Sequence, residues 1–87
     1  MKKESKYKAL RRLKIIEGQV RGLQKMVSEE KYCIDIITQT EAIKKALSGA
    51  EDVILENHLS THVYHQMKHG QESKAIKELI EVYKLKK

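Results

Sequence analysis

The chain has 87 residues and a net charge of +6, and its composition already excludes several classes of protein. Its single cysteine excludes an internal disulfide, and the absence of a long apolar run behind the basic start argues against a secretory or membrane segment, so we expect a cytoplasmic protein. A domain of this size buries only about 60% of its unfolded surface, and the chain has neither Phe nor Trp to fill a core. We therefore expect a single domain over residues 1–87 that is stabilised by self-association.

Positive charge is concentrated at the amino-terminal end. Residues 1–25 contain nine Lys or Arg and two Glu, a net charge of +7, whereas the remaining 62 residues have a net charge of −1. Such a segment predicts a polyanionic partner, with a solvated basic face as the alternative. An anionic membrane surface is disfavoured because the apolar positions of the segment are needed for packing. Without Phe or Trp to stack on bases, duplex DNA is favoured over single-stranded nucleic acid.

The first predicted element is an amphipathic helix over about residues 5–28. Its apolar seam repeats at steps of three and four residues, as one face of a helix requires, and it consists of Leu10, Leu13, Ile16, Val20, Leu23 and Val27. The basic side chains of this helix that we expect to contact DNA phosphates are Lys8, Arg11, Arg12, Lys14, Arg21 and Lys25. A second contribution comes from the middle of the next helix, from Lys44 and Lys45.

The second predicted element is a long helix from about residue 32 to the glycine at position 70, which is expected to terminate it. Its seam alternates strictly between steps of four and three residues, and Cys33 and His58 continue it at its two ends. The members of the seam are Ile36, Thr40, Ile43, Leu47, Ala50 and Ile54. A short third helix is predicted by Ala75, Ile76, Leu79, Ile80 and Tyr83. The sequence therefore predicts an all-α protomer of three helices.

All four histidines of the chain lie in the last part of the long helix. His58, His62, His65 and His69 are separated by four, three and four residues, which on an α-helix places them along one stripe. Cys33, the only cysteine, lies 25 positions before His58. At a rise of about 1.5 Å per residue this separation is about 37 Å. Cys33 and the histidines therefore cannot meet within one chain.

A second copy of the chain would bring these side chains together. In an antiparallel pair of long helices, Cys33 of one chain faces His58 and His62 of the other, and the helices cross near Lys45 and Ala46, where small residues permit close approach. A thiolate with two imidazoles suits Cu(I), and it accepts Zn(II), Ni(II) or Co(II) with additional donors. The alternatives are a cysteine that only packs in the seam and a histidine stripe that is only a polar face.

Three blocks of the sequence resemble a known family. RRLKIIEGQVRGLQKMV, YCIDIITQTEAIKKAL and ENHLSTHV are similar to the CsoR/RcnR family of metal-sensing transcriptional repressors, and the resemblance covers nearly the whole chain. It implies an antiparallel helical dimer, a flat tetramer built as a dimer of dimers, and binding of operator DNA without a helix-turn-helix. It also implies metal ligands at Cys33, His58 and His62 that are shared between protomers, and operator contact by Arg12.

The branches of this family differ at single positions. Copper-sensing members usually have Cys where this chain has His62, and in this respect the chain resembles the nickel- and cobalt-sensing branch. That branch takes an additional ligand from a histidine near the amino terminus, which this sequence lacks. Tyr32 and Glu78 match the pair that hydrogen-bonds around the site in the copper branch. We therefore expect Cu(I), with a Ni(II)- or Co(II)-sensing repressor as the alternative.

Other readings of the same residues are weaker. Sulfide-sensing members need two cysteines, and formaldehyde-sensing members have Pro after the initiator Met where this chain has Lys2. His65 and His69 are either additional donors for an octahedral metal or solvent-facing side chains. An enzyme with Cys33 as nucleophile and His58 as base would need an acidic orienting group and a pocket, which a thin bundle offers poorly. A metal buffer without a DNA role would leave the basic segment unexplained.

The predicted activity is repression that metal relieves. By linkage, a metal that binds the DNA-free tetramer more tightly weakens DNA binding by the same factor, typically about 1 to 3 kcal/mol. Metal is therefore expected to act as an inducer, and the resemblance implies derepression of genes for metal export or detoxification. Joining Cys33 to His58 and His62 of a second chain would fix the ends of the paired long helices. Glu78 would draw the third helix onto the site, and the basic faces would then no longer match the operator.

Overall fold

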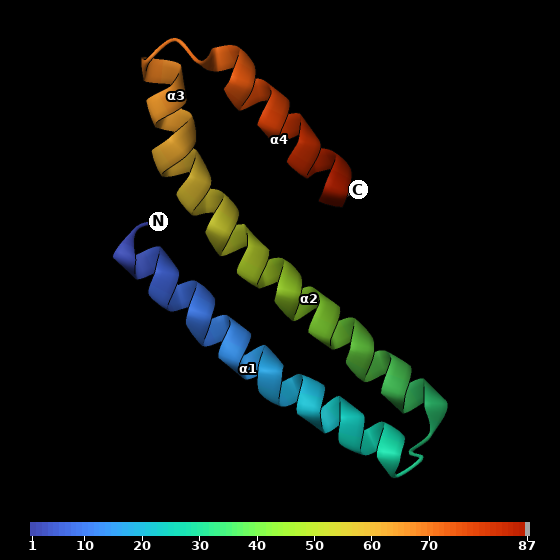
Figure 1. Ribbon diagram of the computed structural model, residues 1–87. Helices are drawn as coiled ribbons and strands as arrows, with labels where there is room; N and C mark the ends of the chain where they lie inside the picture. Colours follow the sequence, from blue (N-terminus) through green and yellow to red (C-terminus); the bar gives the residue numbers. More distant parts are fainter. Residues whose placement is uncertain (87) are drawn as a thin grey trace.

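The computed structural model describes residues 1–86, which are helical almost throughout (Figure 1). Helix α1 spans Lys3–Ser28 and α2 spans Cys33–His58. A π-helical segment, η1 (Leu59–Val63), joins α2 directly to α3 (Tyr64–Lys68), and α4 spans Glu72–Lys86. No strand occurs in residues 1–86. Because α2, η1 and α3 form one continuous arm, the prediction of an all-α protomer with three helices is confirmed.

The two turns of the chain are built in the same way. At the end of α1, Glu30 takes the left-handed conformation (φ 51°), and the N–H of Lys31 donates to the carbonyl of Met26 over 3.0 Å. After α3, Gly70 takes this conformation (φ 74°), and a backbone hydrogen bond of 2.7 Å joins Gln71 to the last helical turn. This arrangement satisfies carbonyls that a helix end leaves free. The predicted termination of the long arm at Gly70 is confirmed.

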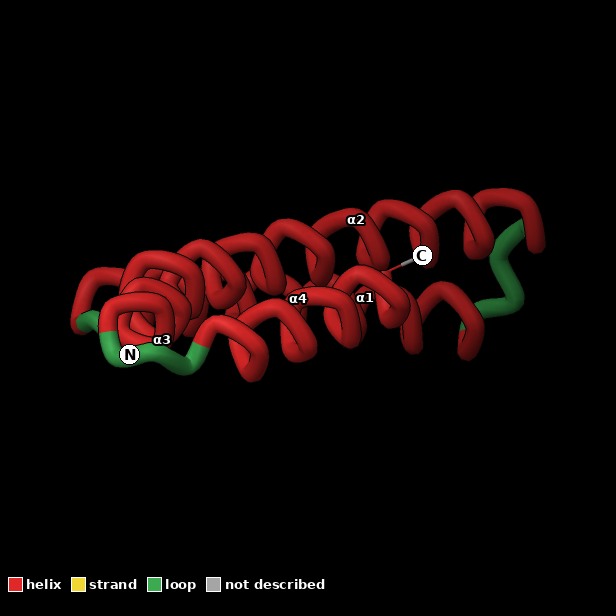
Figure 2. The backbone as a smooth tube through the Cα atoms, turned by 90° about the horizontal axis from the view of Figure 1, so that it is seen from above, coloured by secondary structure: helices red, strands yellow, loops and turns green. Residues whose placement is uncertain are grey.

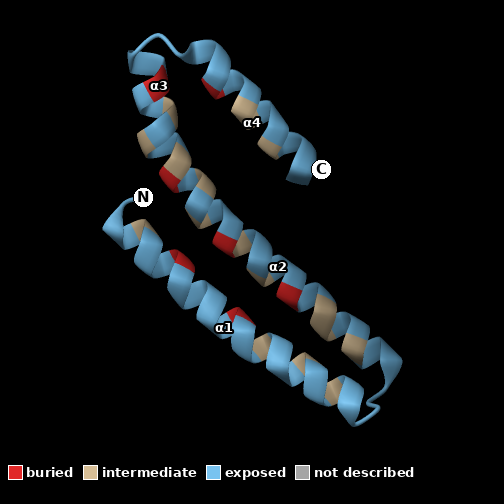
Figure 3. Cartoon of the chain, in the orientation of Figure 1, coloured by how far each residue is buried: buried red, intermediate tan, exposed pale blue. Residues whose placement is uncertain are grey.

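Helices α1 and α2 pack antiparallel along their whole length and hold most of the buried side chains (Figures 1 and 3). The centre of their contact is a cluster of Ile16, Ile43 and Ala50, against which Leu23 and Ala46 pack. This cluster has only five apolar side chains, so the contact between the two helices buries little volume. A core of this size explains why a chain so poor in large apolar side chains needs further contacts for stability.

Part of each predicted seam stays exposed in the single chain, four of six residues in α1 and two of six in α2. In α1, the seam residues that remain exposed are Leu10, Leu13, Val20 and Val27. In α2, Leu47 and Ile54 are each 41% exposed, whereas Ile43 and Ala50 of the same seam are buried. The physical reason is that each apolar stripe is wider than one neighbouring helix can cover. Heptad spacing locates the stripe but does not say which of its edges faces the partner helix.

Helix α4 folds back beside the second half of α2 (Figure 1). Lys86 Nζ lies 3.2 Å from Asp52 Oδ1, and Glu78 Oε2 lies 3.5 Å from His58 Nε2. Ala75 is fully buried at the start of the helix, but most other apolar side chains of α4 are exposed. Polar contacts rather than a shared core therefore hold α4 against α2 in the single chain.

The described part of the chain is a thin plate. Its extents are 56 × 27 × 12 Å, and the smallest of these is about the diameter of one α-helix. Figure 2, which views the molecule from above, shows the helices spread in this shallow layer. None of the helices within residues 1–86 is both long and apolar enough to cross a lipid bilayer.

Candidate metal centre

Cys33 is the first residue of α2, and its thiol is free and exposed. Tyr32 precedes it in the turn and is also exposed. The whole of α2, 26 residues, separates Cys33 from His58. Within residues 1–86, no group of three or more His, Cys, Asp or Glu side chains lies close enough to hold a metal ion. The structure thus agrees with the inference that Cys33 cannot meet the histidines of its own chain.

His58 and His62 form a pair at the other end of α2. Their rings are stacked, with centroids 5.1 Å apart and an interplanar angle of 27°. His58 is partly buried and its Nε2 faces the carboxylate of Glu78 on α4, whereas His62 is exposed. A carboxylate in this position orients an imidazole and raises its basicity as a ligand. Of the two predicted outer residues, Glu78 lies at the histidines, and Tyr32 lies beside Cys33 at the far end of the helix.

The π-helical segment η1 begins directly after His58 and contains His62. Two hydroxyl side chains bond to the backbone at its start. Ser60 Oγ and Thr61 Oγ1 both donate to the backbone carbonyl of Asn57, over 3.2 and 2.6 Å. Such bonds compete with the normal helical ladder, and π segments often occur at functional sites. The adjacent Ser and Thr before His62 are the signal in the sequence for this feature. The spacing of the histidines alone does not reveal it.

His65 on α3 and His69, directly after it, form a separate pair. Their ring centroids are 4.2 Å apart, with an interplanar angle of 43°, and both side chains are exposed. Because η1 begins after His58 and includes His62, it changes the phase of the helix before His65 is reached, and the four histidines do not follow one α-helical stripe. The prediction of a single stripe is corrected in this respect: the histidines form two pairs, one at the junction of α2 and η1 and one at the end of α3.

Asn57, directly before His58, connects this end of α2 to the start of the basic helix. Its side chain is only 3% exposed, and its Oδ1 accepts a hydrogen bond of 2.9 Å from the backbone N–H of Lys2. Lys2 immediately precedes α1. The position that carries a predicted metal ligand is therefore tied to the helix that carries the predicted DNA contacts. No pattern in the sequence marks Asn57 as the link between these two helices.

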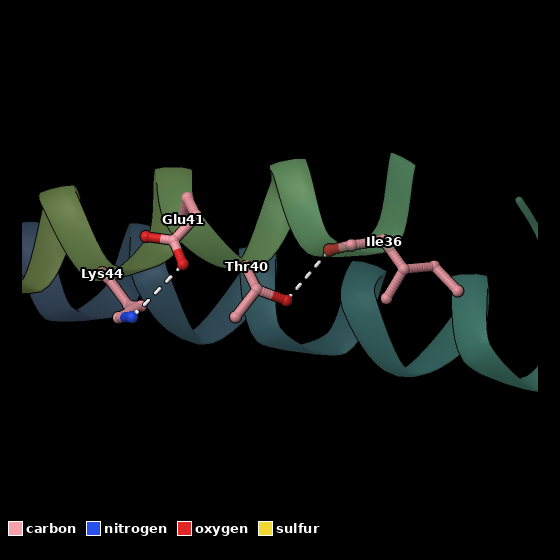
Figure 4. Close-up of polar contacts among 4 residues, drawn as sticks. All are labelled: Ile36, Thr40, Glu41 and Lys44. Carbon is pink, nitrogen blue, oxygen red and sulfur yellow. Dashed lines mark hydrogen bonds and ion pairs between the residues drawn. The ribbon is translucent and has the colours of Figure 1, made fainter. Parts of the chain in front are cut away.

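The residues predicted to contact DNA are all exposed. Several take part in ion pairs along their own helix, such as Arg21 with Glu17 (3.1 Å) and Lys44 with Glu41 (3.2 Å). Figure 4 shows the pair on α2, one turn after the Thr40 hydroxyl that donates to the carbonyl of Ile36. Exposed pairs of this kind are weak and exchange readily for phosphate contacts. Over residues 1–86, no ion pair involves Arg11, Arg12, Lys14 or Lys45.

Arg12 reaches across to α2. A side-chain carbon at Gly49 would lie 3.3 Å from Arg12 Nη1, so the guanidinium rests against the backbone of the long helix. On α1, Lys14, Arg21 and Lys25 follow at steps of seven and four and therefore share one side of the helix. The basic residues thus occupy more than one face of α1.

Residues 5–84 match the family described as metal-sensitive transcriptional repressors. The chain belongs to this family. The resemblance found from the three sequence blocks is therefore confirmed. Because the family consists of transcriptional repressors, the alternative of an enzyme is excluded, and membership implies binding of operator DNA.

Relatives within the family are copper sensors by name. The chain is 44% identical over 73 residues to the copper-sensing transcriptional repressor CsoR of Bacillus subtilis, which covers 84% of this chain and 72% of the relative. It is 48% identical over 50 residues to the copper-sensing repressor RicR of Mycobacterium tuberculosis, covering 58% and 52%. It is 37% identical over 76 residues to the CsoR of the same organism, covering 87% and 64%. The chain thus spans between about half and three quarters of the length of these repressors.

A solved structure of the family has the same fold. The crystal structure of the copper-sensing repressor CsoR with Cu(I) from Geobacillus thermodenitrificans superimposes with a TM-score of 0.88 at 41% identity. The match covers 98% of this chain and 88% of that chain. The arrangement of α1, the continuous α2–η1–α3 arm and α4 is therefore that of a metal-sensitive repressor.

Proposed function

We propose that this protein is a copper-responsive repressor. Its metal-free form binds operator DNA, and Cu(I) releases it, which turns on genes for copper export or detoxification. The observation that supports this proposal most is the match, over 98% of the chain, to a repressor solved with Cu(I). The chain acts as a single domain, residues 1–87, in the cytoplasm.

The donor set suits a soft cation of low coordination number. Cys33, His58 and His62 would hold Cu(I), and the metal would supply the bond that joins the ends of two helices. Two of the donors already lie together, since the rings of His58 and His62 are stacked and Glu78 is beside His58. Thiolate and imidazole ligands select Cu(I), whereas Ni(II) and Co(II) favour further donors. His65 and His69 lie on a segment of different helical phase, which argues against their joining the same site.

The site is complete only with a second copy of the chain. Exposed apolar side chains at heptad spacing lie on both helices of the hairpin, Leu13 and Val20 on α1 and Leu47 and Ile54 on α2. Because α1 and α2 run antiparallel, helical phase places these residues on the same side of their contact. Cys33 continues this side at one end of α2. We infer that a second copy covers it, with the two α2 helices antiparallel and two shared sites related by symmetry.

The assembled repressor would be a flat tetramer made of two such dimers. A plate only 12 Å thick has two broad faces, and covering one of them in the dimer leaves the other for DNA or for the second dimer. Arg12 lies over Gly49, and helical phase places both on the side of the hairpin away from the exposed apolar side chains. The proposed phosphate contact of Arg12 is therefore spatially separate from the proposed dimer contact.

Release would follow when the metal joins Cys33 of one chain to His58 and His62 of the other. The side chain of Asn57, directly before His58, accepts a hydrogen bond from Lys2 at the start of α1. The carboxylate of Glu78 on α4 faces His58 itself. A change in the position of His58 on metal binding would therefore reach both the basic helix and α4. Linkage requires that tighter metal binding by the DNA-free form weakens DNA binding by the same factor.

The proposal is tested by the fluorescence anisotropy of a labelled duplex taken from the chain's own promoter. Metal-free protein should bind this duplex, and stoichiometric Cu(I) should release it. Ni(II), Co(II) and Zn(II) are titrated in parallel, together with formaldehyde, and Cys33→Ser serves as the variant that Cu(I) should fail to release. Release by Ni(II) or Co(II) but not by Cu(I) would assign the protein to the alternative branch. Failure of every effector would reject the proposal.

A further inference from the structure

The Thr61 hydroxyl lies between two polar atoms and has a single proton to give. Its Oγ1 is 2.6 Å from the backbone carbonyl oxygen of Asn57 and 3.2 Å from Nδ1 of His62. A carbonyl oxygen can only accept a hydrogen bond, whereas a hydroxyl supplies one donor and two acceptor lone pairs. The contact with Asn57 therefore uses the only proton of Thr61.

The role of Thr61 toward His62 follows from this assignment. With its proton directed to Asn57, Thr61 Oγ1 can only accept from His62, so Nδ1 of His62 must carry the proton. In a neutral imidazole one nitrogen is a donor and the other an acceptor. The Nε2 of His62 is then the nitrogen with a free lone pair.

We propose that Thr61 is a positioning residue that holds His62 in the Nδ1–H tautomer and so presents Nε2 to a soft metal cation. This inference rests on the proposed function for the part that concerns the metal. In free histidine the Nε2–H tautomer predominates, and the proposed role of Thr61 is to reverse this preference. A hydrogen bond to the second ring nitrogen commonly sets the tautomer and orientation of a metal-binding histidine.

The opposite assignment conflicts with the distances. If Thr61 donated to His62, the 2.6 Å contact with Asn57 would bring two acceptor oxygens together without a proton. The usual O–H···O distance is about 2.7–2.8 Å, so a contact of 2.6 Å is that of a well-formed hydrogen bond. Asn57 would then keep only the longer bond of 3.2 Å from Ser60. The proton therefore lies between Thr61 and Asn57.

The neighbouring histidine is oriented through its other nitrogen. Nε2 of His58 faces Glu78 Oε2 at 3.5 Å, which leaves Nδ1 of His58 away from the carboxylate. The two stacked imidazoles therefore direct different ring nitrogens to their protein partners. This difference makes them distinguishable in one spectrum, with His58 as an internal reference for His62.

The test is a two-bond ¹H–¹⁵N correlation spectrum of the metal-free, full-length protein, recorded at a pH above the titration of its histidines. His62, assigned by comparison with His62→Gln, should show a protonated Nδ1 and an unprotonated Nε2. Thr61→Val keeps the shape of the side chain without the hydroxyl and should return His62 to the Nε2–H form. Thr61→Ser should keep the Nδ1–H form. Ser60→Ala is the matched control, because it removes the other hydroxyl that bonds to Asn57 and should leave the tautomer of His62 unchanged.

Cu(I) competition titrations on the same proteins provide the second measurement. Removing a group that orients a ligand typically lowers metal affinity about 10- to 100-fold, so Thr61→Val should lose affinity by this factor while Ser60→Ala should not. An Nε2–H tautomer in the wild-type protein, or an unchanged tautomer in Thr61→Val, would overturn the inference. Unchanged Cu(I) affinity in Thr61→Val would overturn it as well. Failure of the wild-type protein to bind Cu(I) would instead reject the proposed function and, with it, the role of Thr61 toward the metal.

Discussion

The three proposed ligands have different surroundings in the chain, and this determines what their replacement would reveal. Cys33 is exposed at the start of α2 and packs against no core residue. His58 faces Glu78, and His62 lies beside Thr61. Loss of the Cys33 side chain should therefore leave the fold of the protomer intact, so its role as a ligand can be measured separately from any role in packing.

Cys33→Ala should lower Cu(I) affinity by more than the roughly 10- to 100-fold loss that follows removal of an outer partner, while helical content and thermal unfolding of the metal-free protein stay unchanged. The repressor should still bind its operator but should no longer be released by Cu(I). Competition titration, circular dichroism and anisotropy measure these effects. His69→Ala is the matched control, because it removes an exposed imidazole of the other pair. Tight Cu(I) binding by a folded Cys33→Ala protein would contradict the proposed site.

The buried side chain of Asn57 should matter for stability. Asn57→Ala would leave the backbone N–H of Lys2 without its partner at the start of α1. A part-buried donor that loses its acceptor costs about 1–3 kcal/mol in the free energy of unfolding. Urea unfolding measures this loss. Thr38→Val is the control, because the Thr38 hydroxyl makes an exposed bond to the carbonyl of Ile34 and its removal should have little effect. An equal loss of unfolding free energy in the two variants would show that the bond to Lys2 contributes no more to stability than an exposed hydrogen bond.

At the scale of whole helices, α1 combines two functions on different faces. Ala9 and Ile16 pack toward α2, whereas Arg12, Arg21 and their basic neighbours are exposed. The Arg12 side chain rests on the second helix, against Gly49. A charge on the rigid hairpin loses less freedom on binding phosphate than one on a free side chain. We therefore expect Arg12 to contribute more to operator affinity than Arg21.

Arg12→Ala and Arg21→Ala should both weaken operator binding and flatten its dependence on salt, by about 0.9 in the logarithmic slope for each phosphate that the variant no longer neutralises. Cu(I) affinity should be unchanged. The measurement is anisotropy over a series of salt concentrations. Lys74→Ala, which removes an exposed cation from α4, is the control and should keep the wild-type slope. Unchanged slopes in both arginine variants would place the DNA surface elsewhere on the molecule.

At the scale of the whole molecule, the long α2 helix makes the site depend on association. The helix keeps Cys33 and His58 at its opposite ends, so each end of a single chain has only part of the proposed donor set. Two antiparallel copies would supply the missing donors at both ends at once. Exposed apolar side chains such as Leu47 and Ile54 give such a pair a surface to bury.

Complementation between two variants tests this assembly. Cys33→Ser and the double variant His58→Ala with His62→Ala should each bind no Cu(I) tightly. After they are unfolded and refolded together, about half of the dimers are mixed, and each mixed dimer has one intact site of two, so about a quarter of the wild-type capacity should return. Mass spectrometry confirms that mixed dimers form, and the separately refolded variants are the control. Zero recovery in confirmed mixed dimers would refute the antiparallel arrangement.

The sequence by itself determined the helices and the position of the turns, and it proposed the donors. These features depend on local causes: apolar periodicity places a helix, a residue such as Gly70 terminates it, and the length of α2 separates Cys33 from His58 whatever the rest of the fold does. The three motif blocks likewise lie within single helices and their turns. These features depend on residues that are close in sequence, and they can therefore be predicted without the tertiary structure.

Only the tertiary structure decided which edge of each apolar stripe is buried, where Arg12 rests, and how the histidines are oriented. Leu47 and Ile43 belong to the same predicted seam, yet only Ile43 is buried, because one neighbouring helix covers part of a wide stripe. Thr61 acts on His62 through a π turn that breaks the phase on which spacing arguments depend. Burial, rotation and hydrogen-bond direction all depend on atoms that are distant in sequence or displaced from ideal helical geometry, and packing sets them.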